Sequence, residues 1–327
     1  MSAGFVVGVD LGGTNIVVGA VSTDGATMLP ALTERTPVDE GAEAVSDRIA
    51  AMIESVIAAA RASHGIDRRD VLGVGVGSPG PLDRARGIVV FTPNLRWTNY
   101  PLRDAIAKRV GLTVTLDNDA NCATLGEWWL GAARGAHHVV GITIGTGIGG
   151  GLIFDGRLFH GATDVAGEVG HMTIEAQGRR CACGNYGCLE AYASGPAIAE
   201  RAREAIAHAD ESVIRELAGG DPSRVTAQLV YEAAAKGGTI AQEVVRDTAR
   251  FLGTGIANLL NIFNPEVVVI ASGVTHAGDA LFEPLRAEVR RRAFRPAWEA
   301  TRIVPGELPG TAGVVGAAAT FLHQHPG

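Results

Sequence analysis

Short apolar runs alternate along the chain with longer segments in which apolar residues recur at helical spacing. The short runs stop at glycine, proline or acidic residues and predict buried strands. Strands are expected at 5–10, 16–21, 32–36, 71–77, 113–116, 139–144, 151–154, 267–270 and 302–304. Helices are expected at 42–62, 102–110, 196–207, 225–235, 240–263, 280–292 and 311–322. This alternation of strands and helices predicts an α/β fold.

Two of the predicted hairpins have the same plan. Each consists of an apolar strand, a turn rich in glycine that carries a threonine, and a second apolar strand. The turns are Leu11–Asn15 and Gly145–Gly150. The repetition predicts two α/β halves that face each other.

Glycine is unusually frequent. It supplies 44 of the 327 residues, about 13 %, whereas about 7 % is average. No Gly-X-Y period is present, which excludes collagen. The excess is therefore expected at turns, close packings and ligand loops. Four glycines fall inside predicted helices and are expected to mark close helix packing without a ligand role: Gly253, Gly255, Gly313 and Gly316.

The charge and apolar patterns exclude several classes of protein. The formal net charge is −7 and no basic run occurs, which argues against a general nucleic-acid binder. No apolar stretch approaches the ~18 residues of a membrane span, and the N-terminus lacks the basic region of a signal peptide. Four cysteines without a leader do not indicate a disulfide scaffold. We therefore expect a cytoplasmic protein without a membrane or nucleic-acid partner.

Two familiar phosphate-binding motifs are disfavoured. Lysine occurs only at Lys108 and Lys236, and neither lies in the Gly-Lys-Ser/Thr context of a Walker A loop. Two stretches that begin at Gly75 and Gly145 match Gly-x-Gly-x-x-Gly, but no helix opens after either, as a Rossmann dinucleotide site requires. A phosphate site in this chain would have to use backbone amides and a metal ion.

The two hairpin turns offer that chemistry. In the first, Asp10 ends a strand and is followed by Gly12, Gly13 and Thr14. Glycine lets the backbone approach a ligand, consecutive amides bind anions, and Asp10 can hold Mg²⁺ through water. An ordinary hairpin turn is the alternative for either turn alone. Together, the two turns favour a site that binds a polyphosphate from both sides.

Asp119 is a candidate general base. It lies in the stretch Leu116–Asn121, which follows a predicted strand and opens a helix. Asp119 or Asp117 could simply cap that helix. A carboxylate at a strand end that faces phosphate turns could instead accept the proton of an attacking hydroxyl.

Three of the four cysteines fall within eight residues as Cys-x-Cys-x₄-Cys, with two glycines that allow so short a loop to bend. Three thiolates and one imidazole fit a closed tetrahedral zinc site. His171 is the first candidate for the fourth ligand, with His160 and Glu190 as alternatives. Three free thiols or a redox function are the competing interpretation.

Together, these motifs resemble those of the ROK family of sugar kinases and repressors, within the hexokinase–actin-like superfamily. The matching stretches, in family order, are Asp10–Thr14, Pro93–Leu95, Asn118–Asn121, Gly145–Gly147, Gly167–Met172, Cys181–Glu190, and Asn264–Glu266 before Gly273. The resemblance implies an α/β fold of two ribonuclease-H-like (actin/hexokinase-like) domains with an active site in the cleft between them. The expected small domain comprises residues 1–117 plus 304–327, and the large domain, with the zinc loop, 118–303.

The resemblance also implies roles for individual residues. Asp119 resembles the general base that takes the proton from the sugar 6-hydroxyl. The implied ligands of the other sugar hydroxyls are Asn94, Asn118, Glu168, His171 and Glu190. The implied nucleotide contacts are Asp10, Gly12, Gly13, Thr14, Asn15, Gly145, Thr146 and Gly147, with Gly273 at the adenosine. The implied structural zinc ligands are His171, Cys181, Cys183 and Cys188.

Within this family the chain is most similar to bacterial glucokinases. That similarity implies phosphorylation of glucose at the 6-hydroxyl by Mg-ATP, in a homodimer or homotetramer. A kinase of mannose, fructose or an N-acyl hexosamine, or one that uses polyphosphate, is an alternative. Asp119 and the phosphate turns disfavour a non-catalytic sugar sensor. A first strand that begins at Phe5 leaves no room for the helix-turn-helix of the family's repressors.

Overall fold

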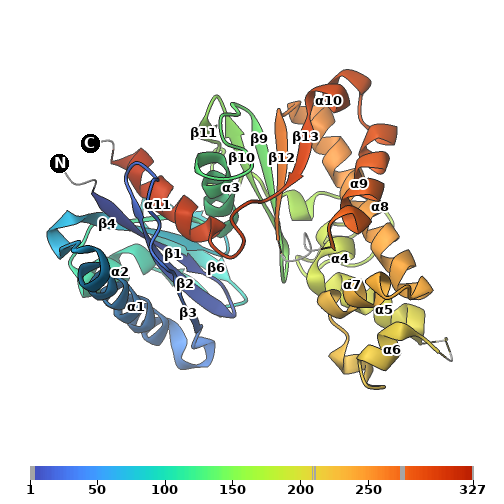
Figure 1. The fold of residues 1–327 in the computed structure, drawn as a ribbon, viewed down its shortest axis with the longest axis horizontal. Helices are drawn as coiled ribbons and strands as arrows, with labels where there is room; N and C mark the ends of the chain where they lie inside the picture. The colour runs from blue at the N-terminus through green and yellow to red at the C-terminus, as the bar shows by residue number, and fades with distance from the viewer. Residues whose placement is uncertain (1–3, 208, 210, 273–276, 326–327) are drawn as a thin grey trace. The chain divides into compact units, whose positions relative to one another are not determined.

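The computed structural model describes residues 4–207, 209, 211–272 and 277–325, which group into two compact units (Figure 1). The first unit consists of Met1–His137, Gly151–Gly167 and Glu307–Gly327, and the second of His138–Gly150 and Glu168–Gly306. The first unit extends beyond the expected boundary at residue 117 because the helix after that residue packs on the C-terminal helix. The domain boundaries expected from the sequence stay a prediction.

A five-stranded sheet with the order β3-β2-β1-β4-β8 forms the centre of the first unit. Its strands are β1 (Phe5–Leu11), β2 (Asn15–Ser22), β3 (Leu32–Arg35), β4 (Val71–Ser78) and β8 (Val114–Asn118). β1 runs antiparallel to β2 and parallel to β4, which is parallel to β8. In this register Asp10 pairs with Gly77, and Gly77 with Asp117. Asp10 therefore lies at the same sheet edge as the strand end that precedes Asp119.

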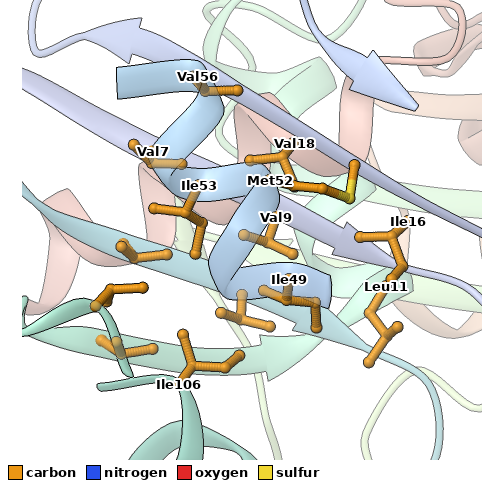
Figure 2. Close-up of a cluster of buried hydrophobic side chains, with 14 of the residues drawn as sticks. Val7, Val9, Leu11, Ile16, Val18, Ile49, Met52, Ile53, Val56 and Ile106 are labelled. Atoms are coloured by element: carbon orange, nitrogen blue, oxygen red, sulfur yellow. The ribbon is translucent and has the colours of Figure 1, made fainter. Parts of the chain in front are cut away.

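Different helices cover the two faces of this sheet, because side chains along a strand alternate between faces. Val7 and Val9 point to one face and pack with Ile49 and Ile53 of helix α1 (Figure 2). Val6 points to the other face and packs with the C-terminal helix. The helices of the unit are α1 (Gly41–His64), α2 (Leu102–Val110), α3 (Asp119–Trp129) and α11 (Ala312–Gln324).

A small antiparallel sheet follows β4 and was not expected from the sequence. Its strands are β5 (Leu82–Asp83), β6 (Ile88–Thr92) and β7 (Trp97–Tyr100). The strands are short, and left-handed residues at Arg96 and Asn99 interrupt the extended pattern. The turn between β6 and β7 carries Asn94, one of the expected sugar ligands.

The second five-stranded sheet has the order β11-β10-β9-β12-β13. Its strands are β9 (Val139–Ile144), β10 (Ile148–Phe154), β11 (Arg157–Leu158), β12 (Val267–Ser272) and β13 (Arg302–Pro305). Strand β9 lies between β10, its hairpin neighbour, and the parallel strand β12, just as β1 lies between β2 and β4 in the first sheet. The α/β class and the repeated plan are confirmed. The predicted strand at 151–154 is corrected, because β10 begins at Ile148 and the turn is shorter.

Helices make up most of the rest of the second unit. They are α4 (Glu190–Ala193), α5 (Gly195–Ile206), α6 (Val213–Leu217), α7 (Ala227–Ala235), α8 (Thr239–Phe263), α9 (Asp279–Arg292) and α10 (Arg295–Ala300). The short helices α4, α6 and α10 were not expected from the sequence. Among the described residues, no helix combines the length and the apolar composition that crossing a membrane requires.

Glycines allow helix α11 to approach its neighbours closely. A Cβ on Gly75 of β4 would lie 1.7 Å from the carbonyl oxygen of Ala317, and one on Gly316 would lie 1.5 Å from that of Cys122 in α3. Neither position has room for a side chain. The close packing expected of the helical glycines is confirmed here and at Gly253 and Gly255, where a Cβ would lie 2.8 Å from another side chain.

Candidate active site

The β1–β2 turn presents exposed polar groups on a fixed backbone. The amide of Gly12 donates to the Asn15 carbonyl at 2.9 Å, and the Thr36 hydroxyl donates to the Gly12 carbonyl at 2.7 Å. Thr14 and Asn15 are exposed at its tip. A Cβ on Gly13 would lie 3.1 Å from the Cβ of Asn94. The structure thus places the expected sugar ligand Asn94 beside the expected phosphate turn.

Asp10 and Asp119 bring two carboxylates together at the edge of the first sheet. Burial, with the nearby charge of Asp119, raises the pKa of Asp10 from its ordinary value of 3.8 to about 7. The Asp10 carboxylate lies against α11, where a Cβ on Gly313 would be 2.3 Å from its Oδ2. Gly313 therefore shapes the candidate site, contrary to the expectation that it serves only helix packing.

Asn118, rather than either aspartate, caps helix α3. Its side-chain oxygen accepts hydrogen bonds from the amides of Ala120 at 2.9 Å and Asn121 at 3.2 Å. Asp119 is the first residue of the helix and is half-buried, and its Oδ1 also accepts from the Ala120 amide, at 2.8 Å. The capping interpretation of Asp119 and Asp117 is therefore corrected, because the cap comes from the residue between them.

The second turn is built like the first. The amide of Gly145 donates to the Gly147 carbonyl at 2.9 Å, which closes the turn between β9 and β10. The carbonyl of Gly145 accepts from the amide of Gly195, the first residue of α5, also at 2.9 Å. Gly145 and Thr146 are exposed. Because the Gly145 amide is used within the turn, the groups that the turn can offer an anion are the Thr146 hydroxyl and the amides of Thr146 and Gly147.

A cavity of about 1380 Å³ has Gly145 and Thr146 in its wall, together with residues of α5, α7, α8 and α9 such as Arg203, Tyr231 and Arg246. Small-molecule sites commonly measure roughly 300–1,000 Å³, so the cavity has room for a small-molecule ligand. These wall residues were not expected from the sequence, because they are spread over several helices and share no motif. The expected adenosine contact Gly273 lies outside the described residues.

Glu168, His171 and Glu190 come together in the second unit. A 3₁₀ turn over Val169–His171 brings His171 Nε2 to 4.0 Å from Glu168 Oε2. Burial raises the pKa of Glu168, an effect that His171 opposes and the negative charge of Glu190 increases. The Oε2 of Glu190 accepts a hydrogen bond from the amide of Ile148 at 2.9 Å. These groups can accept and donate several hydrogen bonds, as a sugar requires.

Three cysteines and His171 form a compact donor cluster. The four donor atoms lie within 4.8 Å of one another, and all belong to the expected zinc ligands: His171, Cys181, Cys183 and Cys188. The sulfurs of Cys183 and Cys188 are 3.7 Å apart, and Cys181 Sγ lies 3.9 Å from His171 Nδ1. Zn–S bonds of about 2.3 Å in a tetrahedron place two sulfurs about 3.8 Å apart. The donor set therefore fits zinc.

The rival fourth ligands are not among the four clustered donors. His160 Nε2 lies 2.9 Å from Asp117 Oδ2. Glu190 borders the cluster, with Oε1 3.7 Å from Cys181 Sγ, while its Oε2 accepts a hydrogen bond from the Ile148 amide. The Nδ1 of His171 faces the sulfurs while its Nε2 faces Glu168. A metal on Nδ1 would thus fix the ring and its tautomer with the other nitrogen beside the carboxylate.

The comparisons with known proteins cover nearly the whole chain. The model of the ROK family matches residues 6–324. A glucokinase from Thermotoga maritima is 42% identical over 321 residues, which is 98% of each chain. A glucokinase from Streptomyces coelicolor is 35% identical over 318 residues, which is 96% of each chain.

Solved structures agree. The crystal structure of a ROK family glucokinase from Streptomyces griseus, in complex with glucose and AMPPNP, matches with a TM-score of 0.84 at 37% identity. The match covers 97% of this chain and 99% of that one. It confirms the expected actin/hexokinase-like α/β fold. By the family model, the full-length relatives and the shared fold, the chain belongs to the ROK family.

Proposed function

We propose that the protein is a hexokinase-type phosphotransferase that transfers the γ-phosphoryl group of ATP to the 6-hydroxyl of glucose. The observation that carries this proposal is the placement of Asp119 beside Asp10 at the sheet edge that bears the β1–β2 phosphate turn. Relatives along the full chain that are named glucokinase, and a solved relative bound to glucose and AMPPNP, support the choice of glucose and ATP.

Asp119 is proposed as the general base. The proton of the sugar 6-hydroxyl passes to its carboxylate while the hydroxyl oxygen bonds to the γ-phosphorus and ADP departs. The Asn118 cap and the start of α3 fix the position of Asp119. Glu168, His171 and Glu190, with Asn94 and Asn118, hold the remaining hydroxyls of the sugar.

The nucleotide is proposed to use the backbone of both glycine turns. Amides near Gly12–Asn15 and Gly145–Gly147 donate to the phosphates, and the cavity beside Gly145 takes the nucleoside. Mg²⁺ supplies charge neutralisation for the phosphates, and Asp10 is the residue proposed to hold it. The raised pKa of Asp10 fits a carboxylate placed to meet a cation.

Zinc is proposed as a structural ion. It would be held by His171 and the three cysteines, and what it supplies is a fixed orientation of His171. The transferred phosphoryl group needs no contact with it. A cytoplasmic location, expected from the charge and apolar patterns, and a homodimeric or homotetrameric assembly, implied by the family resemblance, remain predictions.

The test is a coupled assay with purified protein across hexoses and phosphoryl donors. Glucose with Mg-ATP should give the highest kcat/KM. Mannose, fructose and N-acetylglucosamine test the sugar, and polyphosphate tests the donor. A higher kcat/KM with another sugar or donor would reassign the substrate, and no turnover with any pair would reject a kinase.

A further inference from the structure

Asp117 is a fully buried carboxylate whose two oxygens serve different parts of the first unit. It lies at the end of β8, two residues before Asp119. Isolated buried charges are costly, so a carboxylate persists there only when its hydrogen bonds are satisfied. The proposed chemistry has so far given Asp117 no role.

The Oδ1 of Asp117 holds the junction between β8 and α3. It accepts a hydrogen bond from the Asn118 amide at 2.8 Å and one from the side-chain nitrogen of Asn121 at 3.1 Å. One partner precedes Asp119 in the chain and the other follows it within the first helical turn. The backbone of Asp119 is therefore pinned from both sides.

The Oδ2 of Asp117 holds two loops. It lies 3.0 Å from Arg84 Nε, after β5, and 2.9 Å from His160 Nε2, after β11. Arg84 also pairs with Asp164, at 3.4 Å from its Oδ1. Burial opposes the ionisation of Asp117, but the hydrogen bond and charge of His160, with Arg84 and Asn121, outweigh it and hold its pKa below the ordinary value.

The segment His160–Ala166 is a closed loop. The amide of Ala166 donates to the His160 carbonyl at 3.1 Å, and Gly161 and Asp164 have left-handed φ angles of 73° and 59°. The chain leaves this loop directly toward Glu168, a proposed sugar ligand. Contacts that hold His160 and Asp164 therefore fix the point from which the chain continues to Glu168.

We propose that Asp117 is a positioning residue, which through one oxygen orients Asp119 and through the other anchors the loop His160–Ala166 that leads to Glu168. The proposal rests on the proposed sugar kinase activity. It assigns Asp117 a part in both turnover and sugar affinity, without contact with either substrate.

Asp117→Asn tests the proposal, because an amide has one acceptor oxygen, whereas the Asn118 amide on one side and the Arg84 guanidinium on the other cannot accept a hydrogen bond. Whichever way the new amide turns, its NH₂ group faces one of these two groups. In the full-length protein we expect kcat to fall about 10- to 100-fold, the cost of a small misplacement of a reacting group. The KM for glucose should rise, and the KM for ATP should stay unchanged. A partly unfolded preparation would lower kcat and leave both KM values as they were.

Glu127→Gln is the matched control. Glu127 is also buried and lies on α3, but at the other end, where it accepts from the amides of Ala132 at 3.0 Å and of Glu307 and Leu308, both at 2.9 Å. This variant should lower Tm and leave the KM for glucose and the kcat per folded molecule unchanged. An equal rise in the KM for glucose in Glu127→Gln would overturn the proposal.

His160→Ala tests the loop anchor separately and keeps the buried carboxylate, so it covers the case in which Asp117→Asn does not fold. Loss of one hydrogen bond to the loop should raise the KM for glucose about 2- to 10-fold and leave kcat within about twofold. An unchanged KM for glucose in His160→Ala, or unchanged constants in a folded Asp117→Asn, would reject the positioning role. Absence of glucose phosphorylation in the wild-type protein would instead reject the proposed function.

Discussion

Gly313 leaves the space that the carboxylate of Asp10 occupies: a Cβ on Gly313 would lie 2.3 Å from Asp10 Oδ2. A methyl group at this position must move either the carboxylate or the helix. Gly313→Ala is therefore expected to raise the Mg²⁺ concentration for half-maximal activity and to lower kcat. Gly253→Ala, in a tightly packed part of α8, is the control. It should lower Tm without changing the Mg²⁺ dependence, and equal Mg²⁺ curves for both variants would contradict the role of Gly313.

The stability of the metal-free protein should depend on the ionisation of Asp10. Its pKa is raised from 3.8 to about 7, so the charged form is disfavoured in the folded state. Well below pH 4 the group is protonated in both states and costs nothing. As pH rises from about 4 to 7 the cost grows, and above about 7 it reaches at most about 4 kcal/mol.

Asp10→Asn removes that cost. The variant should gain Tm over the wild-type protein at pH 8, with the difference shrinking toward pH 4, while its Mg-dependent turnover falls. Thermal unfolding between pH 4 and 8, without metal or nucleotide, measures this. If the Tm values of the two proteins changed with pH in parallel, ionisation of Asp10 would not destabilise the folded state, contrary to the prediction.

Asp119→Asn should abolish turnover and preserve sugar binding. An amide cannot accept the hydroxyl proton, and loss of a general base commonly costs about 10²- to 10⁴-fold in rate. The Kd for glucose, measured by calorimetry, should change by less than about threefold. Asp39→Asn, an exposed carboxylate in the same unit, should retain full activity. Substantial turnover by Asp119→Asn would exclude this residue as the base.

The cysteine cluster should hold one zinc ion per chain. Metal analysis should find the ion in the purified wild-type protein and should not find it in Cys183→Ala. The variant should also bind glucose more weakly, because His171 is no longer fixed. Cys122→Ala is the matched control, since that buried cysteine lies in α3, outside the cluster. Retention of zinc by Cys183→Ala, or its absence from the wild-type protein, would contradict the zinc site.

Local patterns predicted most of the fold. The helix at 102–110 and the strand at 139–144 begin and end where expected, because Pro101 and Gly111 delimit the first and Gly145 follows the second. The turn after β9 was predicted too long, since glycines within a strand look like turn residues in the sequence. The small sheet after β4 was missed although its central strand β6 is a short apolar run; its two partner strands, β5 and β7, carry no such run.

The sequence predicted many residues of the candidate site, but it did not predict the contacts between residues that are far apart in the chain. The three cysteines lie within eight residues, so their spacing suggests a metal site, but spacing left His171 as one of three candidates for the fourth ligand. Two of the partners of Asp117, Arg84 and His160, are far from it in the chain and were in none of the matched motifs. The contact of Gly313 with Asp10 is similarly remote, because it joins the two ends of the chain. Such connections arise only from tertiary packing.

The carboxylate of Glu190 constrains how sugar preference can evolve in this chain. Its Oε2 accepts a hydrogen bond from the amide of Ile148, which follows Gly147. The same side chain therefore supports the Gly145–Gly147 turn, a proposed phosphate-binding turn, and is also proposed to bind the sugar. A Cβ on Gly147 would lie 2.5 Å from that oxygen, which leaves neither residue free to change alone. Substitutions that adapt the pocket to another hexose are therefore expected at Glu168, because Asn94 lies against Gly13 of the other proposed phosphate turn.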